Sequence, residues 1–281
     1  MSSLSVEAGS RPWSNNPLAL LLLGVALCIV WVGGNLLFPG LAPTGIPSVL
    51  ARVAIHSATL IGLWAALQRT DFSPGKRTTV WLAIAIPFTL WLIVIWTLAV
   101  GGAFQPAPGL RLPRLPIAIF LPLILALPLL LWSRALGAVL DVTPAAWLIA
   151  LQVYRVFGGI FLVDWPNGKV AGAFAWPAGV GDMATGIMAL PVALAVASGT
   201  TSGRRAGLWW NVFGLLDFAV AITMGNLTAP GPFQRFGFDI PASLAGTYPT
   251  VMIPAFSVPS SILLHALSLR QLTRRQIRSQ M

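Results

Sequence analysis

Four residues that are charged in water lie inside long apolar stretches of this sequence. They are two arginines and two aspartates, namely Arg52, Arg155, Asp182 and Asp217. Such a residue costs about 2.5–3.5 kcal/mol at the centre of a membrane helix, so it normally faces the bundle interior and pairs with an opposite charge. A buried arginine can hold an anionic group, and a buried aspartate can exchange a proton. The chemistry expected here is therefore ion pairing, anion binding or proton transfer.

The positions of these residues within their apolar stretches predict two ion pairs. Arg155 and Asp217 are each the twelfth residue of stretches that run in the same direction. At about 1.5 Å per helical residue, the two side chains reach similar depths near the middle of a membrane. The same reasoning places Arg52 level with Asp182. We therefore expect an Arg155–Asp217 contact and an Arg52–Asp182 contact.

Four further polar residues join the candidate binding cluster, namely His56, Tyr154, Asn226 and His265. Tyr154 and Asn226 either line a cavity or hydrogen-bond to neighbouring backbone. Ser261 precedes His265 by four residues, so the two side chains share one face of a helix. They form either a nucleophile and its base or an ordinary hydrogen bond, and we expect the hydrogen bond.

No cofactor is predicted from the sequence. Lysine is absent from the apolar stretches, which excludes a retinal Schiff base, and metalloprotease, Cys-x-x-Cys, Walker and dinucleotide-binding patterns are missing. A haem held by both histidines is unfavourable, because His56 and His265 differ in depth by about 8 Å. A metal site made of His56, Asp182 and Asp217 is conceivable, but their spacing does not specify one.

The elements that must position these residues follow from the composition. Of the 281 residues, 57% are hydrophobic and 9% are charged, and the mean hydropathy is +0.83. A soluble domain carries roughly 25% charged residues, so this surface must face lipid. The net charge of +10 does not indicate nucleic-acid binding, because the basic residues lie in short loops between apolar stretches. The single cysteine, Cys28, excludes an intramolecular disulfide.

Eight stretches reach the roughly 20 residues that a helix needs to cross a bilayer. They are 17–38, 46–68, 79–103, 115–133, 144–164, 177–198, 206–226 and 250–270. The expected fold is an all-α polytopic transmembrane helix bundle of eight spans, with residues 1–281 forming one integral membrane domain. Segment 227–249 is too interrupted by glycine and proline to span and is expected to be an ordered loop. Whether this loop caps the outer face stays open.

The distribution of basic residues predicts the orientation. The N-terminus, the loops after the even-numbered spans and the tail hold eleven lysines and arginines, namely Arg11, Arg69, Lys76, Arg77, Arg134, Arg204, Arg205, Arg270, Arg274, Arg275 and Arg278. The loops after the odd-numbered spans hold four, namely Arg111, Arg114, Lys169 and Arg235. Because basic loops stay in the cytoplasm, both termini are expected there.

The second half of the chain, over about residues 150–272, resembles a family of proteins. The similarity lies in V-Y-R-V-F-G-G-I-F-L-V at 153–163, F-A-W-P-A-G-V-G-D-M-A-T-G at 174–186, N-V-F-G-L-L-D-F-A-V-A at 211–221 and Y-P-T-V-M-I-P-A-F-S-V-P-S-S-I-L-L-H at 248–265. These strings are similar to those of an uncharacterised family of bacterial multi-pass membrane proteins. The resemblance implies a bacterial inner (cytoplasmic) membrane, and it implies no activity.

Two classes of function agree with these features. The first is binding or transport of a small solute, with or without a proton, through a charged cavity inside the membrane. The second is an intramembrane enzyme acting on a lipid-soluble substrate, with the aspartates and His56 as acid and base. A sensor or assembly partner is a third class. The expected partners are the lipid bilayer, a small solute or lipid-like ligand, and a second copy of the chain, but no nucleic acid.

Overall fold

The computed structural model describes residues 16–40, 45–105, 114–240 and 242–280. Within these ranges every regular element is a helix, and no strand is formed. The prediction of an all-α fold is therefore confirmed. Arg11 and Arg111, which entered the count of basic residues, lie outside the described ranges, and so does part of the 227–249 loop.

Seven helical segments in the described part of the chain are long and apolar enough to cross a membrane. They are α1 (Pro17–Leu37), α2 (Ile46–Leu67), α3 (Pro74–Val100), α4 (Arg114–Trp132), the run Ala145–Asp164, α8 (Gly172–Ala197) and α9 (Thr201–Thr228). The run Ala145–Asp164 combines α6 (Ala145–Ala150), the 3₁₀ helix η2 (Leu151–Gly159) and α7 (Ile160–Asp164). The chain is thus a multi-pass integral membrane protein.

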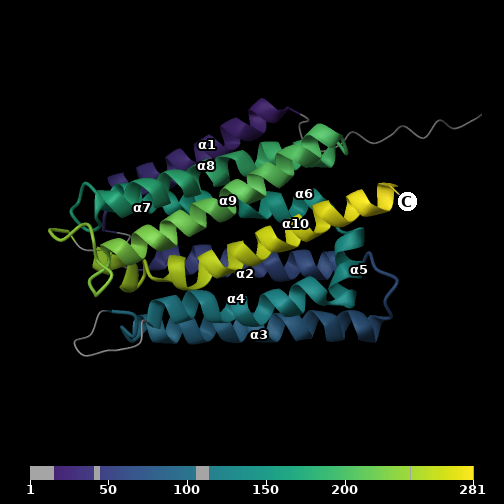
Figure 1. Cartoon of the computed structure of the whole chain (residues 1–281), viewed down its shortest axis with the longest axis horizontal. Helices are drawn as coiled ribbons and strands as arrows, with labels where there is room; N and C mark the ends of the chain where they lie inside the picture. The colour runs from purple at the N-terminus through teal and green to yellow at the C-terminus, as the bar shows by residue number, and fades with distance from the viewer. Residues whose placement is uncertain (1–15, 41–44, 106–113, 241, 281) are drawn as a thin grey trace, which may run out of the picture.

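The last long helix, α10 (Val258–Gln280), follows the π-helical segment η4 (Ile253–Ser257). It packs against α4, α6 and α9 along the bundle. Its composition is less apolar than that of the other seven, because its second half is rich in arginine and glutamine. The end of α10 and the start of α1 lie at the same end of the bundle (Figure 1).

Several helices begin earlier than their apolar stretches predict, because polar caps precede those stretches. Ser73 accepts a hydrogen bond from the backbone of Lys76, and Pro74 occupies the first turn, so α3 begins at Pro74 rather than at residue 79. Thr200 accepts from the backbone of Gly203 at 3.1 Å, so α9 begins at Thr201 rather than at residue 206. The added turns lie at the polar ends of the bundle.

A short helix that the sequence analysis missed, α5 (Arg134–Val142), lies between α4 and α6. It is amphipathic and packs Leu136, Val139 and Leu140 against the end of α2. Two side chains of α10 bond the carbonyl groups around it. Arg270 donates to the carbonyl oxygens of Leu130 and Ser133, and Gln271 donates to those of Leu140 and Thr143. The polar end of α10 thereby closes this end of the bundle.

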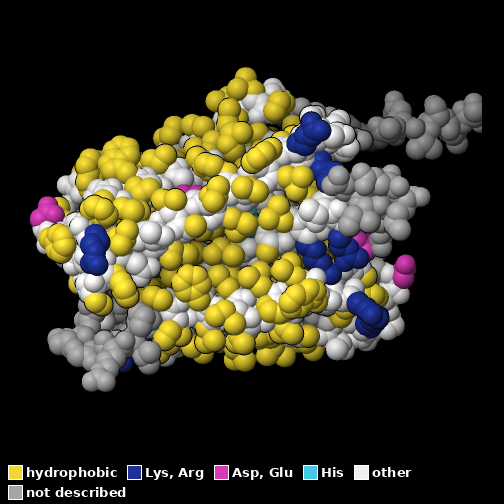
Figure 2. All heavy atoms as spheres, in the orientation of Figure 1, with side chains coloured by type: hydrophobic (Ala, Val, Ile, Leu, Met, Phe, Trp, Pro, Cys, Tyr) yellow, Lys and Arg dark blue, Asp and Glu magenta, His cyan; other side chains and the backbone are white. Residues whose placement is uncertain are grey.

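The helices form a bundle in which α8 lies beside α1 (Figure 1). α8 packs against α9, η2, α1 and α6, while α3 lies beside α2 on the opposite side of the molecule. The outer faces of α3 and α4 expose large apolar side chains, among them Leu90, Ile93, Ile124 and Leu129. These two helices carry the lipid-facing surface that their uniformly apolar sequences predict. Figure 2 shows the same apolar cover along the bundle, with lysine and arginine gathered toward its ends.

Candidate functional site

Arg155 is the centre of a buried ion cluster. It lies in η2 and is 3% exposed, and its Nε donates to Oδ1 of Asp182 on α8 at 2.7 Å. Its second terminal nitrogen also forms an ion pair with Asp217 on α9. One guanidinium group therefore binds two carboxylates from two helices. The predicted Arg155–Asp217 contact is confirmed, whereas the predicted Arg52–Asp182 contact is wrong, because Asp182 is bound by Arg155.

The remaining terminal nitrogen of Arg155, Nη1, bonds to groups other than the two carboxylates. It donates to the carbonyl oxygen of Gly214 at 3.3 Å and lies 3.1 Å from Nε2 of His265. Arginine can only donate, so Nε2 of His265 accepts and the ring proton lies on Nδ1. That proton is donated to Oδ1 of Asn211 at 2.9 Å. The phenyl ring of Phe218, 3.8 Å from the guanidinium carbon, covers its face.

Tyr154 and Ser261 form a second polar contact beside this cluster. Ser261 donates to Oε1 of Gln152 at 2.8 Å, and the Tyr154 hydroxyl lies 2.7 Å from the serine oxygen. Since the serine proton goes to Gln152, Tyr154 donates to Ser261. The contact joins η2 to α10. The expected Ser261–His265 hydrogen bond is wrong, because Ser261 bonds to Gln152 and Tyr154. His265 bonds instead to Arg155 and Asn211.

Three glycines provide the space that the cluster occupies, and the sequence analysis did not recognise this role. A Cβ atom at Gly158 would overlap the carboxylate of Asp182, and one at Gly181 would overlap that of Asp217. A Cβ at Gly214 would meet the ring of His265 at 2.5 Å. The only signal in the sequence was the presence of small residues on the helix faces that carry the charges.

Two of the predicted binding residues lie away from the cluster. His56 stacks on Phe88, and its Nε2 lies 3.1 Å from the Thr89 hydroxyl of α3. Its packing is therefore with α3 and not with the aspartates. Asn226 lies near the end of α9, where it lines the main cavity described below and donates its amide nitrogen to the carbonyl oxygen of Ile222 at 2.8 Å. Tyr154, Arg155, Asp182, Asp217 and His265 are the predicted residues that the structure brings together.

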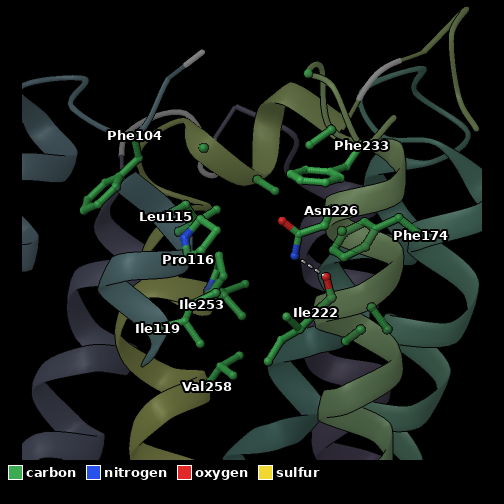
Figure 3. A pocket seen from close by; sticks show the side chains of 18 of the residues that line it. Phe104, Leu115, Pro116, Ile119, Phe174, Ile222, Asn226, Phe233, Ile253 and Val258 are labelled. Atoms are coloured by element: carbon green, nitrogen blue, oxygen red, sulfur yellow. Dashed lines mark hydrogen bonds between the residues drawn. The ribbon is translucent and has the colours of Figure 1, made fainter. Parts of the chain in front are cut away.

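A large cavity leads from the end of the bundle toward the ion cluster. This main cavity has a volume of about 450 Å³ and lies between α4 and α10 on one side and α8 and α9 on the other (Figure 3). Its walls are mainly apolar, and they include Leu115, Ile119, Phe174, Ile222 and Ile253. Asp182 contributes to its lining, and residues 229–233 and 245–246 line its mouth. The described part of the 227–249 loop therefore borders this cavity.

Two further cavities adjoin the cluster. A side cavity of about 280 Å³ lies between α1, α2, η2 and residues 244–250. A small cavity of about 20 Å³ is lined by Tyr154, Arg155 and Asp182, and it shares lining residues with each of the other two. Arg52 lines both the side cavity and the small cavity, and Ile253 lines all three. The π-helical segment that begins at Ile253 thus lies where the cavities meet.

The fold and the site define a multi-pass helical membrane protein with a buried arginine–aspartate cluster beneath an apolar cavity. A family described as a domain of unknown function (DUF8737) matches residues 112–273. The chain belongs to this family, in agreement with the resemblance of its second half to an uncharacterised one. The matched residues contain Arg155, Asp182, Asp217 and His265 but not Arg52. No curated protein and no solved structure matches the chain.

Proposed function

We propose that the protein binds a small solute in the main cavity and carries it across the membrane, with the Arg155 cluster exchanging a proton during transport. The observation that supports this proposal is the main cavity, which extends from residues 229–233 to Asp182. Its volume of about 450 Å³ falls within the range of about 300–1,000 Å³ that is usual for small-molecule sites. Ionisable residues inside a membrane commonly mark solute and proton pathways.

The proposed topology has eight spans, with α10 as the eighth, both termini in the cytoplasm and residues 1–281 forming one membrane domain. Among the described residues, eight basic side chains belong to the end where α10 finishes, namely Arg69, Lys76, Arg77, Arg134, Arg204, Arg205, Arg270 and Arg274. Three belong to the opposite end, namely Arg114, Lys169 and Arg235. This asymmetry supports a cytoplasmic position for the first end. The family resemblance supports a bacterial inner membrane.

Irregular helices beside the cluster supply elements that can change shape. Arg155 lies in the nine-residue 3₁₀ helix η2, and the π-helical segment η4 contains Pro254, which lacks a backbone donor. Stretches of 3₁₀ and π geometry within longer helices often mark hinges or functional positions. Tyr154 and Ser261 join η2 to the helix that follows η4. Movement of one segment would therefore be transmitted to the other.

Proton-linked transport is tested in proteoliposomes that enclose the pH indicator pyranine. Sets of monocarboxylates, amino acids and aromatic amines are added outside in turn, and internal acidification or alkalinisation is followed. We expect at least one set to cause a pH change with the wild-type protein. The Asp217→Asn variant should lose this pH change. Asp239→Asn, a change at an exposed loop aspartate, should keep it. Equal responses in protein-free liposomes, or no response to any set, would reject proton-linked transport.

An intramembrane enzyme acting on a lipid-soluble substrate is the second candidate, and the apolar walls of the main cavity favour it. Asp182 is the carboxylate that lines this cavity and would act as acid or base. Mass spectrometry of lipids retained by the purified protein tests this function. A specific acyl or isoprenoid compound should be retained by wild type and lost from Ile222→Trp, which fills the cavity. Retention of bulk lipids alone, in equal amounts by both proteins, would contradict it.

A further inference from the structure

Arg52 is buried without a hydrogen-bond or ion-pair partner among the described residues. It lies on α2 and is 4% exposed, and its Nε makes no hydrogen bond. Among the described residues, no carboxylate lies within salt-bridge distance of it, because Arg155 binds both Asp182 and Asp217. Leaving a buried charge without a hydrogen-bonded partner is strongly unfavourable. The Arg155 cluster, one arginine with two aspartates, offsets the charge of Arg52 across the small cavity, but among the described residues it gives the Arg52 guanidinium no directly bonded acceptor. The position therefore suits an anion that enters from outside the chain and bonds this guanidinium.

The side cavity offers the space for that anion. It is a cavity distinct from the main one, with Ile253 as a lining residue common to both, and Arg52 forms part of its wall. Trp31, Phe157 and Ile160 give it aromatic and aliphatic walls. At about 280 Å³, it is close to the lower limit of typical small-molecule sites. An inorganic ion would leave these apolar walls uncovered.

Polar groups also surround the apolar part of the side cavity. Asn35, Ser48 and Tyr248 contribute to its lining, as do Asp164 and Lys169. Lys169 and Asp164 form an ion pair with each other at 3.4 Å, so each of these two charges already has a partner. Arg52 is thus the cation in this cavity that has no carboxylate at salt-bridge distance among the described residues. A planar guanidinium binds a carboxylate or phosphate through two parallel hydrogen bonds.

We infer that the side cavity is a binding site for an oxyanion carried on an apolar body, and that Arg52 binds the oxyanion. The group is a carboxylate or a phosphate, supplied either by a small amphipathic acid or by the head group of an anionic lipid. This site lies in a different cavity from the one assigned to the transported solute. It therefore stands whether or not transport through the main cavity is found.

Thermal unfolding of the full chain in phosphatidylcholine nanodiscs tests this inference. In the first arm benzoate is titrated, with benzyl alcohol as the uncharged analogue. In the second arm phosphatidylglycerol replaces part of the lipid and no benzoate is added. A ligand that binds the folded state raises the unfolding midpoint by mass action. The variant is Arg52→Gln, and the matched control is Arg205→Gln, which removes an exposed cation of α9 that lines neither cavity.

We expect one of the two anions to raise the unfolding midpoint of the wild type and of Arg205→Gln. Arg52→Gln should show a rise only at about ten- to hundredfold higher anion concentration, as for the loss of charge-assisted hydrogen bonds. Arg52→Lys keeps the charge but cannot form two parallel hydrogen bonds. The anion concentration that it needs should therefore lie between those of the wild type and Arg52→Gln. A rise with phosphatidylglycerol alone identifies a lipid as the source, and a rise with benzoate identifies a soluble acid.

Three results would overturn the inference. One is no rise with either anion in the wild type, and another is an equal rise with benzyl alcohol. The third is a rise of the same size in Arg52→Gln as in Arg205→Gln. If Arg52→Gln does not fold, the comparison of Arg52→Lys with wild type decides in its place, since equal anion dependence in those two proteins also rejects a two-pronged contact. None of these readouts depends on transport.

Discussion

Gly181 lies so close to Asp217 that a single methyl group at residue 181 would overlap the carboxylate of the aspartate. Gly158 has the same relationship to Asp182. Each aspartate therefore rests against the backbone of a neighbouring helix, and this close approach lets one arginine reach both. In the string G-V-G-D, the glycine directly before Asp182 makes room for the other aspartate, which comes from α9.

Gly181→Ala should displace Asp217 from Arg155 and destabilise the protein. Inserting a carbon atom into a packed interior typically costs about 1–3 kcal/mol. The matched control is Gly62→Ala in α2, where a Cβ atom meets nothing within 4 Å. Because alanine favours a helix over glycine, this control should gain roughly 0.5–1 kcal/mol. The free energy of unfolding, measured by titration with sodium dodecyl sulfate in mixed micelles, checks both. Equal effects of the two changes would mean that Gly181 has no special packing role.

Part of this cluster could be predicted from the sequence, because depth along a helix is nearly proportional to residue number. That rule gave the Arg155–Asp217 contact correctly. It gave Asp182 the wrong arginine, because Arg155 lies in a 3₁₀ helix that rises about 2.0 Å per residue instead of 1.5 Å. Helix α8 also begins at residue 172, five residues before its expected start. Such departures from regular geometry depend on tertiary packing and leave no clear pattern in one sequence.

The role of His265 was underestimated for a related reason. Residue spacing predicted only its difference in depth from His56, about 8 Å, and no contact with Arg155, but its Nε2 is 3.1 Å from that arginine. The π-helical segment η4 precedes it and alters both the rise and the facing of the residues that follow. Arg52, by contrast, was correctly expected to face the interior. Its missing partner could be recognised only when both aspartates were seen to bind Arg155.

Replacing Arg155 with glutamine should be strongly destabilising, because it leaves two neighbouring carboxylates buried without a cation. Removing one side of a buried ion pair typically costs about 3–5 kcal/mol. The combined change Arg155→Gln, Asp182→Asn and Asp217→Asn removes all three charges and should recover most of that loss. Unfolding free energies of the single and triple variants are compared in the same micelles. A triple variant as unstable as the single one would show that the charges are not the source of the loss.

Tyr154→Phe should weaken the connection between η2 and α10 by removing the hydroxyl that donates to Ser261. The expected cost is about 0.5–1.5 kcal/mol, the usual net contribution of one hydrogen bond. Ser261→Ala removes the acceptor and also leaves Gln152 without its donor, so it should cost more. In a double-mutant cycle the two effects should not add, because the side chains are in contact. Strict additivity would contradict a direct Tyr154–Ser261 bond in the folded protein.

Arg270→Met should loosen the end of the bundle that holds α5. Arg270 donates to the carbonyl oxygens of Leu130 and Ser133, and methionine leaves both without this partner. Each buried acceptor left unbonded costs about 1–3 kcal/mol, with smaller values where water can reach it. Arg134→Met, a change at an exposed arginine of α5 itself, is the control and should have little effect. Amide hydrogen exchange of residues 134–142 should rise in Arg270→Met and stay unchanged in the control.

The proposed topology makes a prediction about which residues can be reached from outside the cell. Cys28 is the single cysteine, so a Cys28→Ala protein provides a background without thiols. Into it we place one cysteine at a time at three exposed positions, Ser202, Asp239 or Thr273. In intact bacterial cells a membrane-impermeant maleimide should label Asp239→Cys at once. Ser202→Cys should react only after the membrane is opened.

Thr273→Cys distinguishes eight spans from seven. In the structure, the end of α10 lies at the same end of the bundle as the start of α9 (Figure 1). If α10 crosses the membrane, residue 273 should be protected in intact cells together with residue 202, because both then face the cytoplasm. Labelling of residue 273 from outside, together with residue 239, would place the basic tail outside the cell. That pattern would remove α10 from the set of spans, and it would require the Arg155 cluster, which includes His265 of α10, to assemble at a different depth.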